Sequence, residues 1–229
     1  MNLFSGCLGI AFVFEGHLEL SSVCILIAAL FDFFDGMAAR MLNVRSALGM
    51  QLDSLADLVS FGVLPATILF YMMKSSYNLP EIHIAEFNIT PFSAYLLPLF
   101  SAWRLGKFNI DTRQTESFLG LPTPASGILF GSFPLMILNS PLNENYAFIP
   151  GLLSNFYFLL AMIILVCILL VSELPLISLK FKNIKWSYNK YRYILLLIGL
   201  ILIIALGFAA VPVVIAMYII LSTISYFRN

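Results

Sequence analysis

Long apolar segments alternate with short polar breaks along almost the whole chain of 229 residues. Many of these segments approach the roughly 20 residues that an α-helix needs to cross a bilayer. The breaks between them contain Pro, Gly, Asn and charged residues, which favour turns. The apolar segments are residues 3–14, 18–40, 46–73, 91–108, 124–139, 151–173, 193–209 and 211–226.

The pattern predicts an all-α, polytopic membrane bundle of about eight transmembrane helices, forming one domain over residues 1–229. A six-helix core would cover residues 1–173, and a C-terminal helical hairpin would cover residues 193–226. The first segment, residues 3–14, is shorter than a transmembrane helix requires. Its helix therefore either starts before Met1 or is a short interfacial-to-spanning helix.

Composition supports the membrane class. Hydrophobic residues make up 61% of the chain and charged residues 10%, and the mean hydropathy is +0.96. The formal net charge is zero, so there is no case for a nucleic-acid partner. The three cysteines lie apart within apolar segments, and their spacing indicates neither a disulfide nor a metal site.

The basic residues predict the orientation, because cytoplasmic loops of membrane proteins are enriched in Lys and Arg. With a cytoplasmic N-terminus, only Lys74 falls in an outer loop. The other 11 of the 12 basic residues are Arg40, Arg45, Arg104, Lys107, Arg113, Lys180, Lys182, Lys185, Lys190, Arg192 and Arg228. We therefore expect an integral protein of the cell membrane with both termini in the cytoplasm. The basic stretch 180–192 is expected to be a loop that lies on anionic headgroups.

Four aspartates lie near the predicted cytoplasmic ends of the second and third segments. At about 100° per residue, they fall on one face of each helix. The face of the second segment carries Asp32, Asp35, Gly36, Ala39 and Arg40. The face of the third carries Gly49, Asp53 and Asp57. Because the two helices are antiparallel neighbours, the faces can converge on one cavity open to the cytoplasm.

Four carboxylates in such a place need compensating charge. A charged side chain at the centre of a bilayer costs about 2.5–3.5 kcal/mol even on a lenient scale. Hard oxygen ligands favour Mg²⁺, Mn²⁺ or Ca²⁺, and two ions held by shared carboxylates suit in-line phosphoryl displacement. Arg40 could then pair with a phosphate. Gly36 and Ala39 would leave room for a bulky substrate, whereas Gly49 could equally serve helix packing.

These residues form the pattern Asp35-Gly36-x₂-Ala39-Arg40-x₈-Gly49-x₃-Asp53-x₃-Asp57. The pattern matches D-G-x₂-A-R-x₈-G-x₃-D-x₃-D, so the sequence resembles the CDP-alcohol phosphotransferase family. The stretches SALGMQLDSLADLVSFGVLPA, RLGKFNID and FLGLPTPAS resemble the branch of that family whose acceptor alcohol is L-serine. The resemblance covers roughly the first 130 residues.

The resemblance implies transfer of the phosphatidyl group from CDP-diacylglycerol to the L-serine hydroxyl, with release of CMP. It also implies two divalent ions, Mg²⁺ or Mn²⁺, and a homodimer among membrane lipids. Asp57 would be the general base. The metal ligands would be Asp32, Asp35, Asp53 and Asp57. The CDP-lipid contacts would be Gly36, Ala39, Arg40, Ser46 and Gly49. Relatives carry a polar lead-in before the first helix, for which Asn2 is a substitute candidate.

The acceptor is expected to bind the cytoplasmic loop 104–123. Arg104 and Asn109 are the expected partners of the serine carboxylate, and Thr123 and Ser126 are further polar candidates. Each of these residues could instead have a structural role, either as a basic charge that keeps the loop in the cytoplasm or as a turn residue. Glycerol 3-phosphate or an inositol phosphate remains an alternative acceptor. A cation or proton transporter is a further alternative, but it would place charges at the midplane of several helices.

Overall fold

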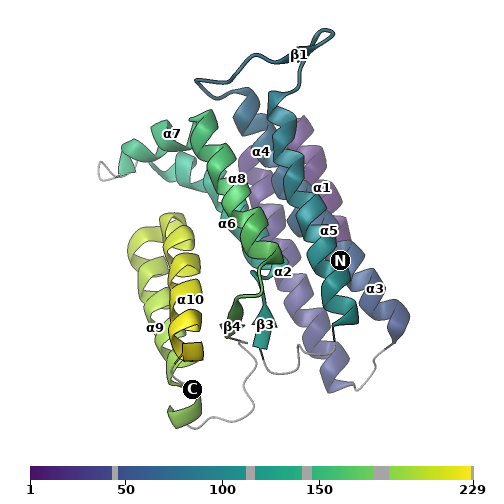
Figure 1. Ribbon diagram of the computed structural model, residues 1–229, viewed down its shortest axis with the longest axis vertical. Helices are drawn as coiled ribbons and strands as arrows, with labels where there is room; N and C mark the ends of the chain where they lie inside the picture. The colour runs from purple at the N-terminus through teal and green to yellow at the C-terminus, as the bar shows by residue number, and fades with distance from the viewer. Residues whose placement is uncertain (43–45, 112–116, 141–145, 178–185, 228–229) are drawn as a thin grey trace.

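The computed structural model describes residues 1–42, 46–111, 117–140, 146–177 and 186–227, which fold as a bundle of helices (Figure 1). Some predictions concern residues outside the described ranges: Arg45, Arg113, Lys180, Lys182, Lys185 and Arg228. The side chain of Arg40 is also outside the description.

The helices follow the apolar segments closely. The core contains α1 (Asn2–Phe14), α2 (Leu18–Met41), α3 (Ala47–Asp57), α4 (Leu64–Lys74), α5 (Leu96–Ile110), α6 (Thr123–Asn139), α7 (Phe148–Leu153) and α8 (Phe156–Val171). A π-helical turn, Leu58–Val63, joins α3 to α4, and a 3-10 helix, Thr90–Tyr95, precedes α5. The C-terminal part contains α9 (Trp186–Leu206) and α10 (Ala210–Phe227).

Two short antiparallel ribbons lie at opposite ends of the bundle (Figure 1). One consists of β1 (His83–Ile84) and β2 (Phe87–Asn88). The other consists of β3 (Ser117–Leu119) and β4 (Pro175–Ile177), which come from distant parts of the chain. The ends of α2 and α5, the start of α3 and the C-terminus lie at the same end of the bundle as β3 and β4 (Figure 1).

Three stretches are long and apolar enough to cross a membrane: Leu18–Ala39, Ala47–Lys74 and Asn189–Tyr226. The last one reverses at Gly207, where φ is +57°, so that α9 and α10 pack against each other as the predicted hairpin. Shorter apolar helices, α1 and α8, pack beside them. The prediction of an all-α membrane bundle is confirmed.

Some predicted boundaries were wrong. Arg104, Lys107 and Asn109 do not lie in a loop, because α5 continues to Ile110. Basic side chains are favourable near a helix C-terminus, so a charge there does not mark the helix end. Residues 186–192 are likewise helical rather than part of a loop. The segment 151–173 is broken before Phe156, where the Asn155 side chain accepts a hydrogen bond from Phe158 N at 3.2 Å.

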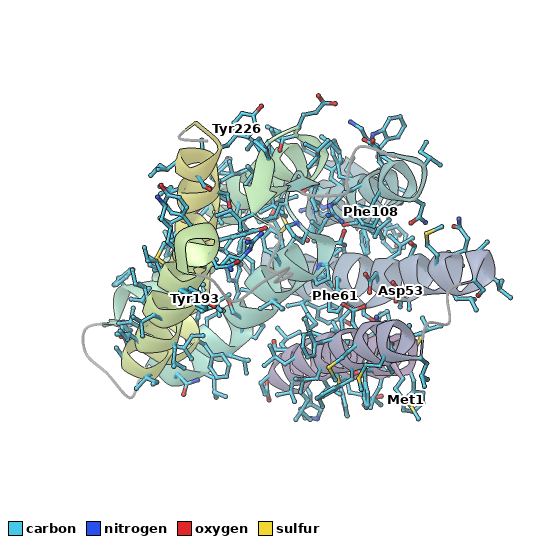
Figure 2. The ribbon with its side chains drawn as sticks, turned by 90° about the horizontal axis from the view of Figure 1, so that it is seen from below. Met1, Asp53, Phe61, Phe108, Tyr193 and Tyr226 are labelled. Carbon is cyan, nitrogen blue, oxygen red and sulfur yellow. The ribbon has the colours of Figure 1, made fainter. Side chains whose placement is uncertain are left out.

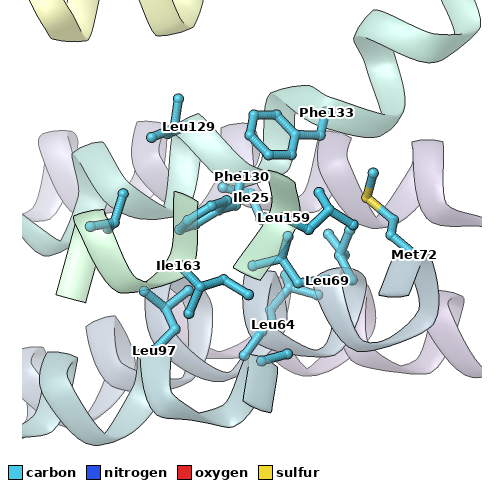
Figure 3. Close-up of a cluster of buried hydrophobic side chains, with 14 of the residues drawn as sticks. Ile25, Leu64, Leu69, Met72, Leu97, Leu129, Phe130, Phe133, Leu159 and Ile163 are labelled. Atoms are coloured by element: carbon cyan, nitrogen blue, oxygen red, sulfur yellow. The ribbon is translucent and has the colours of Figure 1, made fainter. Parts of the chain in front are cut away.

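The buried core lies where the π-helical turn, α4, α6 and α8 meet. Figure 3 shows Leu64, Phe130 and Leu159 among its side chains, all of them fully buried. The backbones approach closely where Gly127 faces Phe61, because a Cβ on Gly127 would lie 2.9 Å from Phe61 Cα. Small residues permit such close helix contacts in membranes. This contact fixes the helix that continues from α3.

Gly120 connects β3 to α6 under two constraints. Its φ is +74°, and an added Cβ would lie 2.6 Å from Leu170 O and 2.8 Å from Ser172 O. Its own N–H donates to Leu174 O at 3.0 Å. Only glycine meets both constraints without strain.

We expect Gly120→Ala to lower the free energy of unfolding by more than about 1 kcal/mol. Backbone strain alone costs about 1–3 kcal/mol, and the steric clash adds to it. The measurement is the thermal unfolding midpoint in detergent. Gly151→Ala is the matched control, because an added Cβ at Gly151 meets no atom within 4 Å in the part of the chain that the structure describes. Equal midpoints for the two variants would contradict the expectation.

Candidate active site

Three of the four aspartates come together between α2 and α3. Carboxylate oxygens of Asp32, Asp35 and Asp53 all lie within 4.8 Å of one another. Asp32 is half-buried, and Asp35 and Asp53 are exposed. In Figure 2, Asp53 lies where α3 faces the N-terminal helices. The converging faces expected from helical spacing are therefore present for these three side chains.

This set of donors suits a divalent cation. All three are hard carboxylate oxygens, the ligand type that Mg²⁺, Mn²⁺ and Ca²⁺ prefer. Three negative charges this close repel one another unless a cation lies among them. The exposure of Asp35 and Asp53 also leaves the group accessible to a substrate.

Asp57 differs from the other three in its surroundings. Its side chain is only 8% exposed, and its Oδ1 accepts a hydrogen bond from Asn2 Nδ2 at 2.9 Å. Its charge still interacts with those of Asp32 and Asp53. Asp57 therefore lies beside the group of three, in a more enclosed position.

The π-helical turn directly after Asp57 anchors this part of the site. Ser60 Oγ donates to Asn2 O at 3.1 Å, so Asn2 contacts both Asp57 and the turn that follows it. Gly6 on α1 faces Ser60 at close range. Such π turns occur often at functional sites. Here the turn and α1 together fix where the Asp57 carboxylate lies.

The candidates for CDP-lipid contact lie on the same two helices as the carboxylates. A Cβ added to Gly36 would meet no atom of the described residues within 4 Å, so packing among these residues does not require glycine there. Ala39 lies one turn further along α2. Ser46 is the N-cap of α3, and its Oγ accepts a hydrogen bond from Gly49 N at 3.0 Å. Space next to Asp35 is thus free on the α2 side.

The candidates for acceptor contact divide into two groups. Arg104 is 8% exposed and donates from Nη1 to Thr123 Oγ1 at 3.1 Å, and its guanidinium lies 5.7 Å from the centre of the Phe108 ring. Ser126 is buried next to them and donates to Thr123 O at 2.8 Å. Asn109 instead contacts α3, where its Nδ2 donates to Ser54 Oγ at 2.9 Å.

Arg104 lies near both the Asp57 carboxylate and Tyr218 on α10. In the described part of the chain, it forms no ion pair or hydrogen bond with either of them, and its side-chain partner is Thr123. Among the described residues, its Nε is buried and has no hydrogen-bond partner. A pocket next to it is lined by Trp103 and Lys107 of α5, Leu119 of β3 and Ser172 after α8. A buried cation with an unused donor can bind an anionic group of a ligand.

Sequence reasoning missed three features of this region. Asn2 was considered only as a contact for the nucleotide of the donor. Its hydrogen bond to Asp57 joins residues 55 positions apart, and no local sequence pattern reveals such a contact. Ser101 is fully buried one turn before Arg104, and its Oγ has no partner in the described structure. Tyr218 comes from the C-terminal hairpin, which the sequence placed outside the six-helix core. A polar side chain within an apolar helix was the available signal for the last two.

The family comparison agrees with this geometry. The model of the CDP-alcohol phosphatidyltransferase family matches residues 1–168. The chain therefore belongs to this family of transferases, and the resemblance inferred from the aspartate motif is confirmed.

Curated relatives extend the similarity beyond the core. The chain is 30% identical over 227 residues to a CDP-diacylglycerol–serine O-phosphatidyltransferase of Helicobacter pylori, covering 98% of this chain and 87% of that protein. It is 36% identical over 127 residues to the Bacillus subtilis protein of the same name, covering 56% of this chain and 67% of that protein. It is also 32% identical over 152 residues to an archaetidylserine synthase of Methanothermobacter thermautotrophicus, covering 65% of this chain and 60% of that protein.

Proposed function

We propose that this protein transfers the phosphatidyl group of CDP-diacylglycerol to the hydroxyl of L-serine, giving phosphatidylserine and CMP. One observation carries the proposal: the carboxylates of Asp32, Asp35 and Asp53 group beside a buried Asp57, in a chain that aligns over 98% of its length with a relative named for this reaction. The names of all three relatives above refer to serine.

Asp32, Asp35 and Asp53 would hold divalent cations, Mg²⁺ or Mn²⁺, and Asp57 would complete a site for two ions. Bound cations would neutralise charge on the pyrophosphate of the donor and on the departing CMP. The donor would approach from the lipid, with its acyl chains in the bilayer. The open space at Gly36 supports this direction, because no atom of the described residues lies within 4 Å of an added Cβ.

Asp57 would be the general base. It takes the proton of the serine hydroxyl, the serine oxygen forms a bond to the phosphorus that carries diacylglycerol, and the bond from that phosphorus to CMP breaks. A base must hold a fixed position relative to the proton that it removes. The hydrogen bond from Asn2 to Asp57 supports this role, because it restrains the carboxylate while leaving Oδ2 available.

Arg104 would bind the serine carboxylate. Among the described residues, its Nε is an unused donor, and Arg104 lines the pocket next to it. Thr123 and Ser126 would support Arg104 rather than contact serine first, since Thr123 accepts a bond from Arg104 and Ser126 bonds to Thr123. Asn109 would act from α5, where it contacts Ser54 of α3, next to Asp53.

The carboxylate end of the bundle would face the cytoplasm of a cell membrane, with the protein as a homodimer. The described basic residues support the orientation. Lys107, Lys190 and Arg192 lie near the end of the bundle that carries β3 and β4, and Lys74 lies at the other end (Figure 1).

The test is an acceptor panel with purified protein, CDP-diacylglycerol and Mn²⁺ or Mg²⁺. We expect CMP release with L-serine to exceed release with glycerol 3-phosphate or inositol phosphate by at least about 100-fold. A site that pairs with a polar group of its substrate strongly rejects alcohols that do not provide it. The measurement is the rate of CMP formation at equal acceptor concentrations. Faster release with glycerol 3-phosphate than with serine would overturn the serine assignment.

A further inference from the structure

The C-terminal hairpin lies beyond residues 1–168, which the family model matches, yet α10 packs against the core. The contact runs through β4, the strand that follows α8. Two hydroxyl groups on α10 bind one residue of that strand. Tyr218 OH donates to Ile177 O at 3.0 Å, and Ser222 Oγ accepts from Ile177 N at 3.1 Å.

These two hydroxyls occupy both backbone groups of Ile177. Tyr218 and Ser222 are four residues apart and therefore lie on the same face of α10. Ser222 is only 1% exposed, so its hydroxyl is enclosed between helix and strand. A strand edge needs partners for its backbone N–H and C=O groups, and here a helix provides them through its side chains. The two bonds fix β4 relative to α10.

The position of β4 determines that of the segment leading to Thr123. Ser117 pairs with Ile177, and Leu119 pairs with Pro175 in the β3–β4 ribbon. Next along the chain, Gly120 N donates to Leu174 O at 3.0 Å, and Leu121 N donates to Leu169 O at 2.9 Å. Thr123 follows as the first residue of α6 and accepts the hydrogen bond from Arg104 at 3.1 Å.

The chain of contacts thus runs from α10 through β4 and β3 to Thr123 and Arg104. Helix α10 also packs directly against α6, the helix that begins with Thr123. Lys107 and Glu173, joined by an ion pair of 3.1 Å, link α5 to the residues just before β4. Since exposed ion pairs contribute little, the two part-buried hydroxyl contacts of α10 are the stronger constraint.

We propose that the C-terminal hairpin is a positioning element for the acceptor pocket: Tyr218 and Ser222 hold β4, and thereby the Thr123–Arg104 pair, where Arg104 binds the carboxylate of the acceptor. The two are positioning residues, which act through Arg104 rather than on the reacting atoms. The inference rests on the proposed function, and it adds that residues outside the family core determine the affinity for serine.

The experiment measures the Michaelis constants for serine and for CDP-diacylglycerol in Tyr218→Phe, Ser222→Ala and the double variant. Each single change removes one hydrogen bond, so we expect KM for serine to rise about three- to tenfold. We expect kcat, KM for CDP-diacylglycerol and the half-saturating metal concentration to stay within about twofold. Arg104→Ala is the reference and should raise KM for serine more than either single variant.

Two matched controls separate this role from a general effect on the helices. Tyr157→Phe removes the hydroxyl of an exposed tyrosine on α8. Thr223→Val removes a hydroxyl of α10 whose hydrogen bond, among the described residues, stays within its own helix, to Ile219 O at 2.9 Å. Both should keep the KM for serine of the unmodified protein.

The outcomes are distinguishable. Unchanged KM for serine in Tyr218→Phe and Ser222→Ala, with active protein, would overturn the positioning role. A parallel loss in kcat, both KM values and the thermal midpoint would also overturn it, because it would show a purely structural contribution. If the unmodified protein releases no CMP with serine, the proposed function itself fails.

Discussion

Replacing Asp57 by asparagine should reduce serine-dependent CMP release by about 10²- to 10⁴-fold, the range that a positioned general base contributes. Asparagine keeps the shape of the side chain and an oxygen that can accept the hydrogen bond from Asn2 Nδ2. The variant therefore removes the proton acceptor while preserving the local packing of an almost fully buried side chain. The measurement is kcat for CMP release, with the thermal midpoint as a check on folding.

Glu81→Gln is the control for this variant. It also converts a carboxylate into an amide, but in an exposed loop next to the β1–β2 ribbon at the other end of the bundle. It should retain full activity. An Asp57→Asn protein that keeps its midpoint and more than about a tenth of the activity would remove Asp57 from the role of base.

Chelation of divalent cations should abolish activity, and added Mg²⁺ or Mn²⁺ should restore it in the unmodified protein. Asp53→Asn should raise the half-saturating metal concentration by more than about tenfold, because changes even to residues that only support metal ligands cost 10- to 100-fold in affinity. The reason is the grouping of Asp53 with Asp32 and Asp35 within 4.8 Å, where one fewer negative charge weakens the attraction to a cation. The measurement is CMP release as a function of free Mn²⁺.

Glu19→Gln is the matched control, since Glu19 lies in the first turn of α2, at the opposite end of the helix that carries Asp32. Its metal dependence should equal that of the unmodified protein. Full activity in the presence of a chelator would contradict the metal site. The same metal dependence in Asp53→Asn and in the unmodified protein would exclude Asp53 as a ligand.

The sequence predicted what depends on periodicity. Positions 32, 35 and 53 converge because helical spacing puts each on the face toward the neighbouring helix, and the apolar segments predicted the helices themselves. The polar side chains of Arg104 and Asn109 suggested a loop, although a helix end accommodates them equally well. Hydropathy alone cannot separate these two cases.

Long-range polar contacts could not be predicted. The bond between Asn2 and Asp57 depends on how α1 crosses the π-helical turn, and the bonds of Tyr218 and Ser222 to Ile177 depend on a two-stranded ribbon inside a helical protein. Both involve single polar residues in apolar helices, whose partners are separated by 40 or more positions. Periodicity describes which face a residue occupies, but not which distant segment that face meets.

The uneven support of α3 has a mechanical consequence. Contacts to α1 and α5 engage α3 at Gln51, Ser54 and Asp57, and the π-helical turn beyond Asp57 is buried in the core. Its first turn, from Ala47 to Met50, is exposed. A helix that is held along its C-terminal half bends most readily at its free N-terminal turn, so bending of α3 would move Ser46 and Gly49 while Asp53 and Asp57 keep their places. We therefore expect the side of the site that is proposed to contact the CDP-lipid to adjust to its ligand, while the carboxylates of α3 stay fixed.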